Sequence, residues 1–460
     1  MTDKPGTMER FGIEHIPEDQ RHGSTGRVFT LWFAANLTIA DYVIGVLCVL
    51  AFHLTLLQSI PILAAGNVLG GLALGLSAAM GPRLGFPQMF SSRAVFGRRG
   101  NYALGMANWI STAGWFTVNT ILGAEAVEAI APGFSLIATS VLLVALQVII
   151  AIFGHDLIHS FEKLMSVVLG ILFLGIFVIS IPRLGEALAF IPAGASDVPS
   201  IGSIGVVLAV SFSYIMSWAP YASDYSRYLP ATSSVRKVAA LALAGGALAS
   251  FAIEVIGGIV GSLTQSFDYF GALKAFAGTF GTLAVFAIIL GAMAANALNI
   301  YTNSLSALVL DLRVKRWVTV IAGGLVGLGL AILGGANFES FFENFLLILD
   351  YWITPWLSII LVDFFVLRRT TVESCLHARN WEVGVLSIYG LSILCSVPFM
   401  VPPTTIGWPV GSLAGWFGGA DFSYYVSFFV AGLLYFLYRE RTAGWWFNGS
   451  QTVSESAKEG

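Results

Sequence analysis

Three asparagines lie along one face of a long apolar segment and could hydrogen-bond a ligand. The segment reads GAMAANALNIYTNSLS from Gly291, and Asn296, Asn299 and Asn303 stand at positions i, i+3 and i+7. Residues at this spacing share one face of a helix, and amides buried in a membrane need hydrogen-bond partners. We expect at least one of them to contact a ligand, with Asn296 and Asn299 ahead of Asn303. The alternative, a bond to a neighbouring helix, fits Asn303 best.

A second group, in the segment GWFTVN, combines an aromatic plate with an amide. Trp115 and Asn119 are four residues apart and therefore share a helix face. An indole ring can stack on a planar ligand, while an amide supplies one donor and one acceptor. The pair suits a planar nitrogen heterocycle. A packing tryptophan and an asparagine bonded between helices would explain the same two residues equally well.

The segment Ser211–Pro230, SFSYIMSWAPYASDYSRYLP, begins as an apolar run and then loses its helical character. Pro220 removes a backbone donor, and Asp224 and Arg227 follow within two turns. Irregular backbone inside a membrane is tolerated only where it is buried in protein or lines a wet cavity. In transporters such a break usually forms the substrate site, and Trp218 lies just before it. An ordinary proline kink, with Trp218 at the membrane interface, is the alternative.

The first apolar segment, LWFAANLTIADYVIGVL, is irregular in the same way. Asn36 and Thr38 stand in mid-span, and Asp41 follows them. Ionisable groups at membrane depth are costly and therefore indicate function by default. We expect Asp41 to carry a coupling proton or to face a cationic part of the substrate, and Glu254 is a weaker candidate for the proton. Breaks in the first and sixth spans are five spans apart, as in two inverted five-helix repeats around a central site.

The composition indicates a polytopic α-helical membrane protein. Hydrophobic residues make up 57% of the chain and charged residues 11%, and the mean hydropathy is +0.81. Long uncharged runs recur without the strict alternation of barrel strands. Twelve candidate spans lie near residues 28–52, 59–81, 103–130, 134–154, 164–182, 201–221, 238–263, 279–310, 318–335, 342–367, 383–401 and 423–439.

The connections between these spans predict the orientation. With the N-terminus in the cytoplasm, every lysine and arginine except Arg183 and Lys274 falls on the cytoplasmic side, as the positive-inside rule requires. Residues 268–278 are expected to form a short surface helix on the outside. The predicted organisation is a cytoplasmic tail (1–27), a first five-helix repeat (28–182), a second inverted repeat (201–367), two further spans (383–439) and a cytoplasmic C-terminal tail (442–460).

The residues that could act in an enzyme do not form a catalytic pattern. We find no nucleophile–base constellation, and His53, His155 and His159 do not combine with carboxylates in a metal-ligand spacing. The three cysteines lie in or near apolar segments and suggest neither a disulfide framework nor a metal site. The sequence therefore predicts no catalytic residue, no metal site and no cofactor.

Four segments resemble the nucleobase:cation symporter-1 family, most of all its purine–cytosine permeases. They are GFPQMFSSRAVFGRRGN from Gly85, GWFTVN, WAPYASDYSRYLP and AANALNIYTNSLS, and the resemblance covers roughly residues 25–440. It implies the LeuT-type five-plus-five inverted repeat with two added spans, and a substrate held between spans 1, 3, 6 and 8. By position, Trp115 and Asn119 match the stacking tryptophan and the amide of span 3. Asn296 and Asn299 match the amides of span 8.

Two parts of the resemblance leave the site open. Trp218 is our match for the aromatic residue of span 6, with Tyr214 and Phe212 as alternatives. Related permeases often carry Asn-Asn-x-Pro-Asn in span 8, whereas residues 295–299 here read ANALN. One amide and the proline are missing, which puts the usual purine–cytosine specificity in doubt.

We expect a secondary active symporter that imports a planar nitrogen heterocycle, such as cytosine or a purine, by alternating access. The alternatives are a vitamin or ureide of the pyridoxine, thiamine, allantoin or hydantoin type, or a non-transporting receptor or channel. The expected partners are the small-molecule substrate and the lipid bilayer of the inner (plasma) membrane, with no nucleic acid. The sequence does not predict an oligomeric state.

The coupling ion is expected to be a proton rather than sodium. In sodium-coupled relatives, the resemblance implies a site between carbonyls of broken span 1 and two hydroxyl side chains of span 8. Those positions are Ala294 and Ala295 here, with Gly291 a turn earlier, and none of these side chains offers an oxygen. A hard cation must replace its water shell with oxygen ligands, whereas a proton needs one titratable group.

Overall fold

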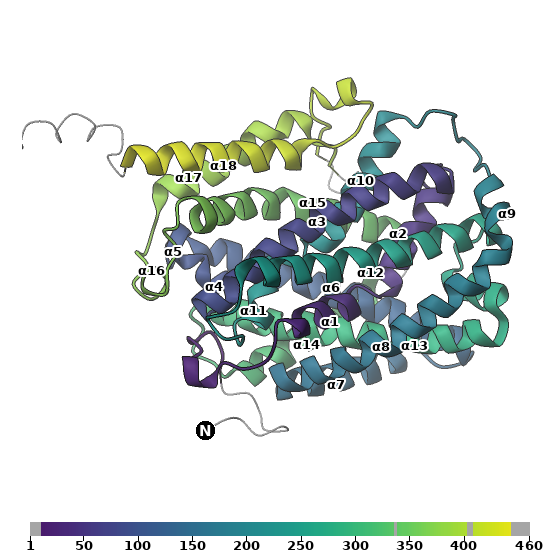
Figure 1. Cartoon of the computed structure of the whole chain (residues 1–460), viewed down its shortest axis with the longest axis horizontal. Helices are drawn as coiled ribbons and strands as arrows, with labels where there is room; N and C mark the ends of the chain where they lie inside the picture. The colour runs from purple at the N-terminus through teal and green to yellow at the C-terminus, as the bar shows by residue number, and fades with distance from the viewer. Residues whose placement is uncertain (1–10, 335–337, 403–407, 443–460) are drawn as a thin grey trace, which may run out of the picture.

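The chain folds as a bundle of helices whose long members run roughly along the horizontal axis of Figure 1. The computed structural model describes residues 11–334, 338–402 and 408–442, and this part of the chain contains helices and no β-strand. Residues 1–10 and 443–460, which belong to the two predicted tails, lie outside the described residues. Both described chain ends lie at the left of Figure 1, together with α4, α5, α11 and α16. We call this the basic end, because Arg93, Arg98, Arg379 and Arg439 belong to these elements, to the adjoining loops and to the end of α18.

The first part of the chain, over its described residues from 11 to 200, forms nine α-helices. They are α1 (Gly26–Ala35), α2 (Ile39–Leu50), α3 (Leu56–Leu84), α4 (Gln88–Ser91), α5 (Arg93–Phe96), α6 (Asn101–Ile130), α7 (Leu136–Phe153), α8 (His155–Ser180) and α9 (Leu184–Ala189). Local sequence sets several of these limits. A capping box of Thr55 and Gln58 starts α3, and glycines with positive φ, Gly85 and Gly154, end α3 and α7.

The second part of the chain contains the remaining described α-helices. They are α10 (Ile201–Met216), α11 (Ala222–Ser226), α12 (Val235–Thr264), α13 (Tyr269–Val309), α14 (Arg316–Gly334), α15 (Phe338–Leu361), α16 (Val372–Leu376), α17 (Val383–Ser396) and α18 (Ser423–Thr442). Non-helical backbone at Gly278, with φ 58°, separates the first turns of α13 from its long remainder. This agrees with the short helix expected over residues 268–278.

Both predicted interruptions are present. Residues Asn36–Thr38 separate α1 from α2, and the two helices are bent by 54° at this point. Regular helix ends at Met216, and a 3₁₀ turn over Ala219–Tyr221, with Pro220 inside it, leads into α11. We call these the span 1 break and the span 6 break.

Close packing of α2 on α12 fixes the position of the span 1 break. A Cβ atom on Gly45 would lie 1.8 Å from the carbonyl oxygen of Glu254, and one on Gly257 would lie 2.1 Å from the carbonyl oxygen of Tyr42. Only glycine fits at either position, so the two backbones touch through a pair of small residues, as membrane helices commonly do.

Several helices are long and apolar enough to cross a membrane. Within the described residues, eight single helices meet this criterion, and the bent pair α1 and α2 makes a ninth candidate. Helix α6 has 30 residues but is more polar, and α17 and α18 also fall outside the criterion, so the count of twelve stays a prediction. Helix α8 begins at His155 rather than near residue 164. Large apolar side chains such as Leu142, Ile171 and Leu325 are exposed on the outer helices, as lipid contact requires.

Candidate functional site

The span 1 break and the span 6 break contact each other directly. The indole Nε1–H of Trp218 donates a hydrogen bond to the side-chain oxygen of Asn36, at 3.1 Å. Both side chains are buried. The Trp218 ring also packs edge-on against Trp32 of α1, at 5.4 Å, and against Tyr221 of the 3₁₀ turn, at 5.3 Å. The two irregular segments therefore form one unit.

Tyr214 connects the span 1 break to α6. Its hydroxyl shares a hydrogen bond of 2.6 Å with the hydroxyl of Thr38, and its ring packs edge-on against Trp115, with ring centres 5.2 Å apart. Phe212, the other alternative to Trp218, stacks instead on Tyr424 of α18. Of the three aromatic residues weighed for span 6, Trp218 and Tyr214 therefore face the breaks, and Phe212 faces the periphery.

The amides of α13 connect the span 6 break back to α6. The hydroxyl of Tyr221 donates to Asn299 Oδ1 at 3.2 Å, and Asn299 Nδ2 donates to Asn296 Oδ1 at 3.4 Å. Asn296 Nδ2 in turn donates to the carbonyl of Phe116 at 3.0 Å and to the hydroxyl of Thr120 at 3.1 Å. These contacts close a circuit around the two breaks.

We call this circuit the central ring. Its members are Trp115, Phe116, Thr120, Tyr214, Thr38, Asn36, Trp218, Tyr221, Asn299 and Asn296. Four of the five predicted substrate residues belong to it. The fifth, Asn119, is buried beside Thr120 on α6.

Two polar atoms next to the central ring have no hydrogen-bond partner among the described residues. They are the indole Nε1 of Trp115, a donor, and Oδ1 of Asn119, an acceptor. Both side chains are at least 96% buried, and they lie one helical turn apart on α6. Because a buried polar group without a partner is unfavourable, this donor and this acceptor are available to a ligand.

The amide stripe divides into two kinds of contact. Asn303 Nδ2 donates to the carbonyl of Trp109 and to the hydroxyl of Thr112, which is the bond between helices expected for it. Asn296 also lies 3.2 Å from Gln147 Oε1 of α7, so its amino group is occupied by α6 and α7. Asn299 is bonded within the ring, to Tyr221 and Asn296.

The two predicted coupling residues lie on neighbouring helices, and one of them, Asp41, lies near the ring. Ser250 of α12 donates to Asp41 Oδ2 at 2.5 Å and also lies 3.4 Å from Asn36 Oδ1. One hydroxyl hydrogen cannot serve both acceptors at once. Glu254, one turn farther along α12, accepts hydrogen bonds from Asn67 and from Ser211. Two residues, Ser250 and Asn36, thus lie between Asp41 and Trp218.

The resemblance implies a sodium site in sodium-coupled relatives between span 1 and span 8. In this protein the residues at the span 8 positions are small and apolar. A Cβ atom on Gly291 would lie 3.2 Å from the carbonyl oxygen of Leu37 in the span 1 break. Ala294 and Ala295 are buried on the same helix. The hydroxyl of Thr38, the nearby side-chain oxygen in the break, is already bonded to Tyr214.

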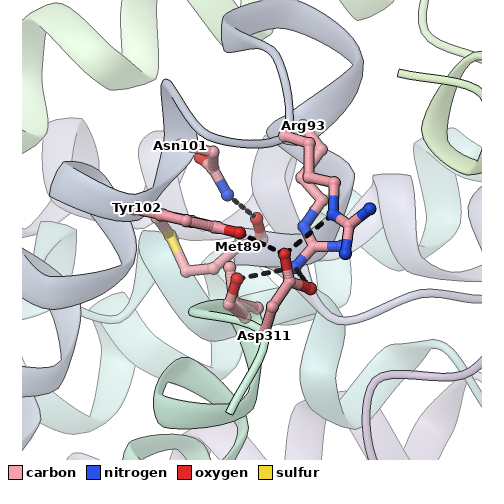
Figure 2. Close-up of polar contacts among 7 residues, drawn as sticks. Met89, Arg93, Asn101, Tyr102 and Asp311 are labelled. Atoms are coloured by element: carbon pink, nitrogen blue, oxygen red, sulfur yellow. Dashed lines mark hydrogen bonds and ion pairs between the residues drawn. The ribbon is translucent and has the colours of Figure 1, made fainter. Parts of the chain in front are cut away.

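A network of charges holds the basic end together (Figure 2). Asp311, between α13 and α14, accepts hydrogen bonds from Arg93 and Arg98 at 2.8 Å and from the hydroxyl of Tyr102. Arg93 also donates to the carbonyl of Val309. Burial acts to raise the pKa of Asp311, but these three donors outweigh it and hold the pKa at about 2. The segment containing α4 and α5 is thereby fastened to the end of α13.

A cavity of about 610 Å³ opens beside this network. Its lining comes from the N-terminal segment, the loop after α5 and the connection from α13 to α14, including Ile13, Arg98, Asp311 and Lys315. None of the residues of the central ring lines it, so we do not assign it to the substrate.

The sequence analysis missed contacts between residues far apart in the chain. It found no metal-ligand pattern among the histidines and treated His155 and Asp156 only as a plausible loop pair. The structure places His22 against both, with His22 Nε2 3.1 Å from Asp156 Oδ1. The prediction of no metal-ligand pattern was made without His22, which stands 133 residues before His155. Glu162 of α8 was also missed; it is buried, and neither carboxylate oxygen accepts a hydrogen bond from the described residues.

A helical membrane bundle with two broken helices, joined by aromatic and amide side chains, has the architecture of a secondary transporter. Residues 15–437 match the family described as "Permease for cytosine/purines, uracil, thiamine, allantoin", and the chain belongs to this family. The resemblance to the nucleobase:cation symporter-1 family is confirmed, and the relatives are permeases rather than enzymes.

Individual relatives cover nearly the whole chain. It is 31% identical to the putative purine-cytosine permease YxlA of Bacillus subtilis, over 94% of this chain and 95% of the relative. It is 26% identical to the purine-cytosine permease fcyB of Emericella nidulans, over 94% and 88%. The fold is shared with the nucleobase-cation-symport-1 transporter Mhp1 in a closed conformation with bromovinylhydantoin bound, with a TM-score of 0.77, 17% identity, and coverage of 95% of this chain and 96% of Mhp1.

Proposed function

We propose that this permease is a secondary active symporter that imports a planar nitrogen heterocycle such as cytosine or a purine. The observation that carries the proposal is the pair of unpartnered buried atoms on α6, Trp115 Nε1 and Asn119 Oδ1. Nucleobase edges present acceptors and donors side by side. A ligand of this class can bond both atoms, which a ligand without a neighbouring donor and acceptor cannot.

The central ring supplies the other contacts. Trp218 covers one face of the heterocycle, whereas Trp115 through Nε1–H and Asn119 through Oδ1 meet its edge. Asn299 and Asn296 contribute through the amide pair that they form with each other, because the amino group of Asn296 is held by α6 and α7. A ligand that donates to Asn299 would replace the hydrogen bond from Tyr221. Because Tyr221 belongs to the span 6 break, ligand binding would then change the contacts of this break.

Asp41 carries the coupling proton in this proposal. When Asp41 is ionised, it attracts the hydroxyl hydrogen of Ser250, at 2.5 Å. When Asp41 is protonated it needs no donor, and Ser250 is released to bond Asn36, which also accepts from Trp218. Proton binding at Asp41 is thereby transmitted to an aromatic wall of the site. The small residues opposite Leu37 favour a proton over sodium, because they supply no oxygen for a hard cation.

The proposed membrane arrangement has twelve spans, arranged as two inverted five-helix repeats followed by two added spans. The basic end faces the cytoplasm, because arginine and lysine are retained on that side. Both termini are then cytoplasmic, and the protein resides in the plasma (inner) membrane.

A vitamin or a ureide is the second candidate substrate, and two observations favour keeping it. The family description names thiamine and allantoin beside the nucleobases. Residues 295–299 also lack one amide and the proline that related purine–cytosine permeases often carry. A receptor or a channel on the same bundle is the alternative outside transport.

A thermal-shift screen of the purified protein identifies the substrate class. A ligand that binds only the folded state raises the unfolding temperature by mass action. We expect a nucleobase among cytosine, adenine, hypoxanthine and uracil to stabilise the protein more than pyridoxine, thiamine or allantoin. Stabilisation by the latter group alone would select the second candidate. Uptake of the stabilising compound into proteoliposomes against its gradient then separates a symporter from a receptor or channel.

A further inference from the structure

Three potential metal ligands from distant parts of the chain meet at the basic end. His22 lies in the segment before α1, and His155 and Asp156 begin α8. One ligand atom from each of the three side chains lies within 4.8 Å of the other two. His22 Nε2 and Asp156 Oδ1 are 3.1 Å apart, and about half of each side chain is exposed. A surface ion pair between His22 and Asp156 would account for this one contact.

The two further imidazoles are not explained by such an ion pair. His155 is 5% exposed, and its ring lies 4.3 Å from the ring of His159, four residues later on α8. Histidines at i and i+4 project from the same face of a helix, which is the spacing of paired zinc ligands in helices. His22, His155 and Asp156 therefore offer two imidazoles and one carboxylate. The ring of His159 lies beside that of His155 and also hydrogen-bonds the backbone of Tyr225.

This ligand set matches a borderline transition metal. Zinc takes four ligands in tetrahedral geometry, with bonds to histidine nitrogen and carboxylate oxygen of about 2.0–2.2 Å, which places donor atoms about 3.4 Å apart. The present separations, up to 4.8 Å, require a closure of roughly 1 Å. His22 stands on a half-exposed segment and can supply that movement by a change of rotamer.

The cluster lies where three segments meet. The backbone N–H of His22 donates to the carbonyl of Tyr228 at 2.6 Å, and the ring of Tyr228 lies 4.0 Å from that of His155. Tyr228 follows the span 6 break, and His22 precedes the span 1 break. A metal bound here would join the segment leading into the span 1 break to the first turn of α8, beside the exit from the span 6 break.

We propose that His22, His155 and Asp156 bind one divalent cation of the zinc type, with water as its fourth ligand. The bound cation cross-links the segment before α1 to α8 and holds the basic end closed. Its effect on uptake rests on the proposed transport function, whereas metal binding itself does not.

Binding is tested by calorimetric titration of ZnCl₂ into the full chain, purified without a histidine tag and stripped with a chelator. We expect one zinc ion per chain, and no comparable binding of MgCl₂, because magnesium prefers oxygen ligands. His22→Ala and Asp156→Asn should each weaken zinc binding at least about tenfold, since each removes one of three protein ligands. Both residues are half-exposed, so both variants should fold. His377→Ala is the matched control, because His377 also pairs with a carboxylate at the surface, Glu373, at 3.3 Å.

The outcomes decide the proposal in either direction. Binding that is absent in the wild type, or equally tight in wild type, His22→Ala and Asp156→Asn, overturns the site. Zinc added on the side of the basic end should slow substrate uptake by the wild type and by His377→Ala, and leave His22→Ala unaffected. If bound zinc does not change uptake by the wild type, the proposed cross-link between the segment before α1 and α8 is contradicted. If the metal-free wild type takes up no heterocycle, the transport function fails while the binding result stands.

Discussion

The indole Nε1 of Trp218 and the side-chain oxygen of Asn36 are 3.1 Å apart, and their hydrogen bond joins the two broken helices to each other. Asn36 also lies within reach of Ser250, which donates to Asp41. An aromatic wall of the proposed site and the proposed proton carrier are therefore connected through one amide. The account of coupling depends on this relationship.

Trp218→Phe tests the connection because it keeps an aromatic ring and removes only the N–H donor. Without this donor, the buried oxygen of Asn36 loses a hydrogen bond, which should destabilise the substrate-binding arrangement by about 1–3 kcal/mol. We therefore expect the apparent substrate affinity to fall at least about fivefold. Trp352→Phe is the control, since its Nε1 donates to Ser111 Oγ at the same distance of 3.1 Å away from the central ring. Transport with equal affinity in wild type and both variants would show that the bond does not shape the site.

Asn119→Ala separates ligand binding from stability. Asn119 Oδ1 has no partner among the described residues, so we expect little change in the unfolding temperature without ligand. Substrate affinity should weaken by about 5–150-fold, the equivalent of 1–3 kcal/mol for one lost hydrogen bond. Asn303→Ala should lower the unfolding temperature and leave the substrate affinity unchanged, because this variant loses the hydrogen bonds to Trp109 and Thr112. Thermal unfolding with and without substrate measures both effects, and equal affinity in Asn119→Ala and wild type contradicts the assignment.

Asp41→Asn keeps the shape of the side chain and an acceptor for Ser250, but it cannot take up and release a proton. We expect this variant to exchange labelled substrate across the membrane and to lose accumulation driven by a proton gradient. Asp197→Asn, a change at an exposed position, is the control and should accumulate substrate normally. Full accumulation by Asp41→Asn at every pH tested would make Asp41 a purely structural residue.

Sequence patterns predicted the two helix breaks. They also predicted which side chains of α6 and of α13 share one helix face. Pro220 and the polar residues Asn36 and Thr38 mark the interruptions because they disturb local helix bonding, and the spacing of Trp115 and Asn119 places them together. Periodicity gives the face of a helix but not the neighbour that this face meets. It therefore did not predict that Asn296 is held by Phe116 and Thr120.

Contacts between distant segments account for the rest. Ser250 has no unusual sequence context, and Tyr221 lies in the span 6 break without a spacing signal of its own. They become functional candidates because the span 1 break and α13 pack against them. His22 was missed for the same reason, as its neighbours His155 and Asp156 belong to a helix far along the chain. Glu162 carries no spacing signal, although a carboxylate within an apolar segment was itself a clue.

Asp311 gives a test of stability against pH. Its pKa in the folded protein is about 2, below the usual 3.8, so the unfolded chain binds the proton more readily. Its contribution to stability is present in full above about pH 5 and is lost as the pH falls from about 4 toward 2. Asp311→Asn, which tolerates the positive φ of this position, should unfold at a lower temperature than wild type at pH 7. The gap between the two unfolding temperatures should narrow as the pH falls below about 4 and close near pH 2. A gap of unchanged size at pH 7 and about pH 2.5 would contradict the ionic role.

The most direct measurement of the central claim is uptake of the best-stabilising heterocycle into proteoliposomes under imposed ion gradients. An inward proton gradient, with equal sodium on both sides, should drive accumulation above equilibrium that a protonophore abolishes, and an inward sodium gradient at zero pH difference should drive none. Accumulation driven by sodium alone, or equilibration without accumulation under either gradient, would contradict a proton symporter built around Asp41 and the central ring.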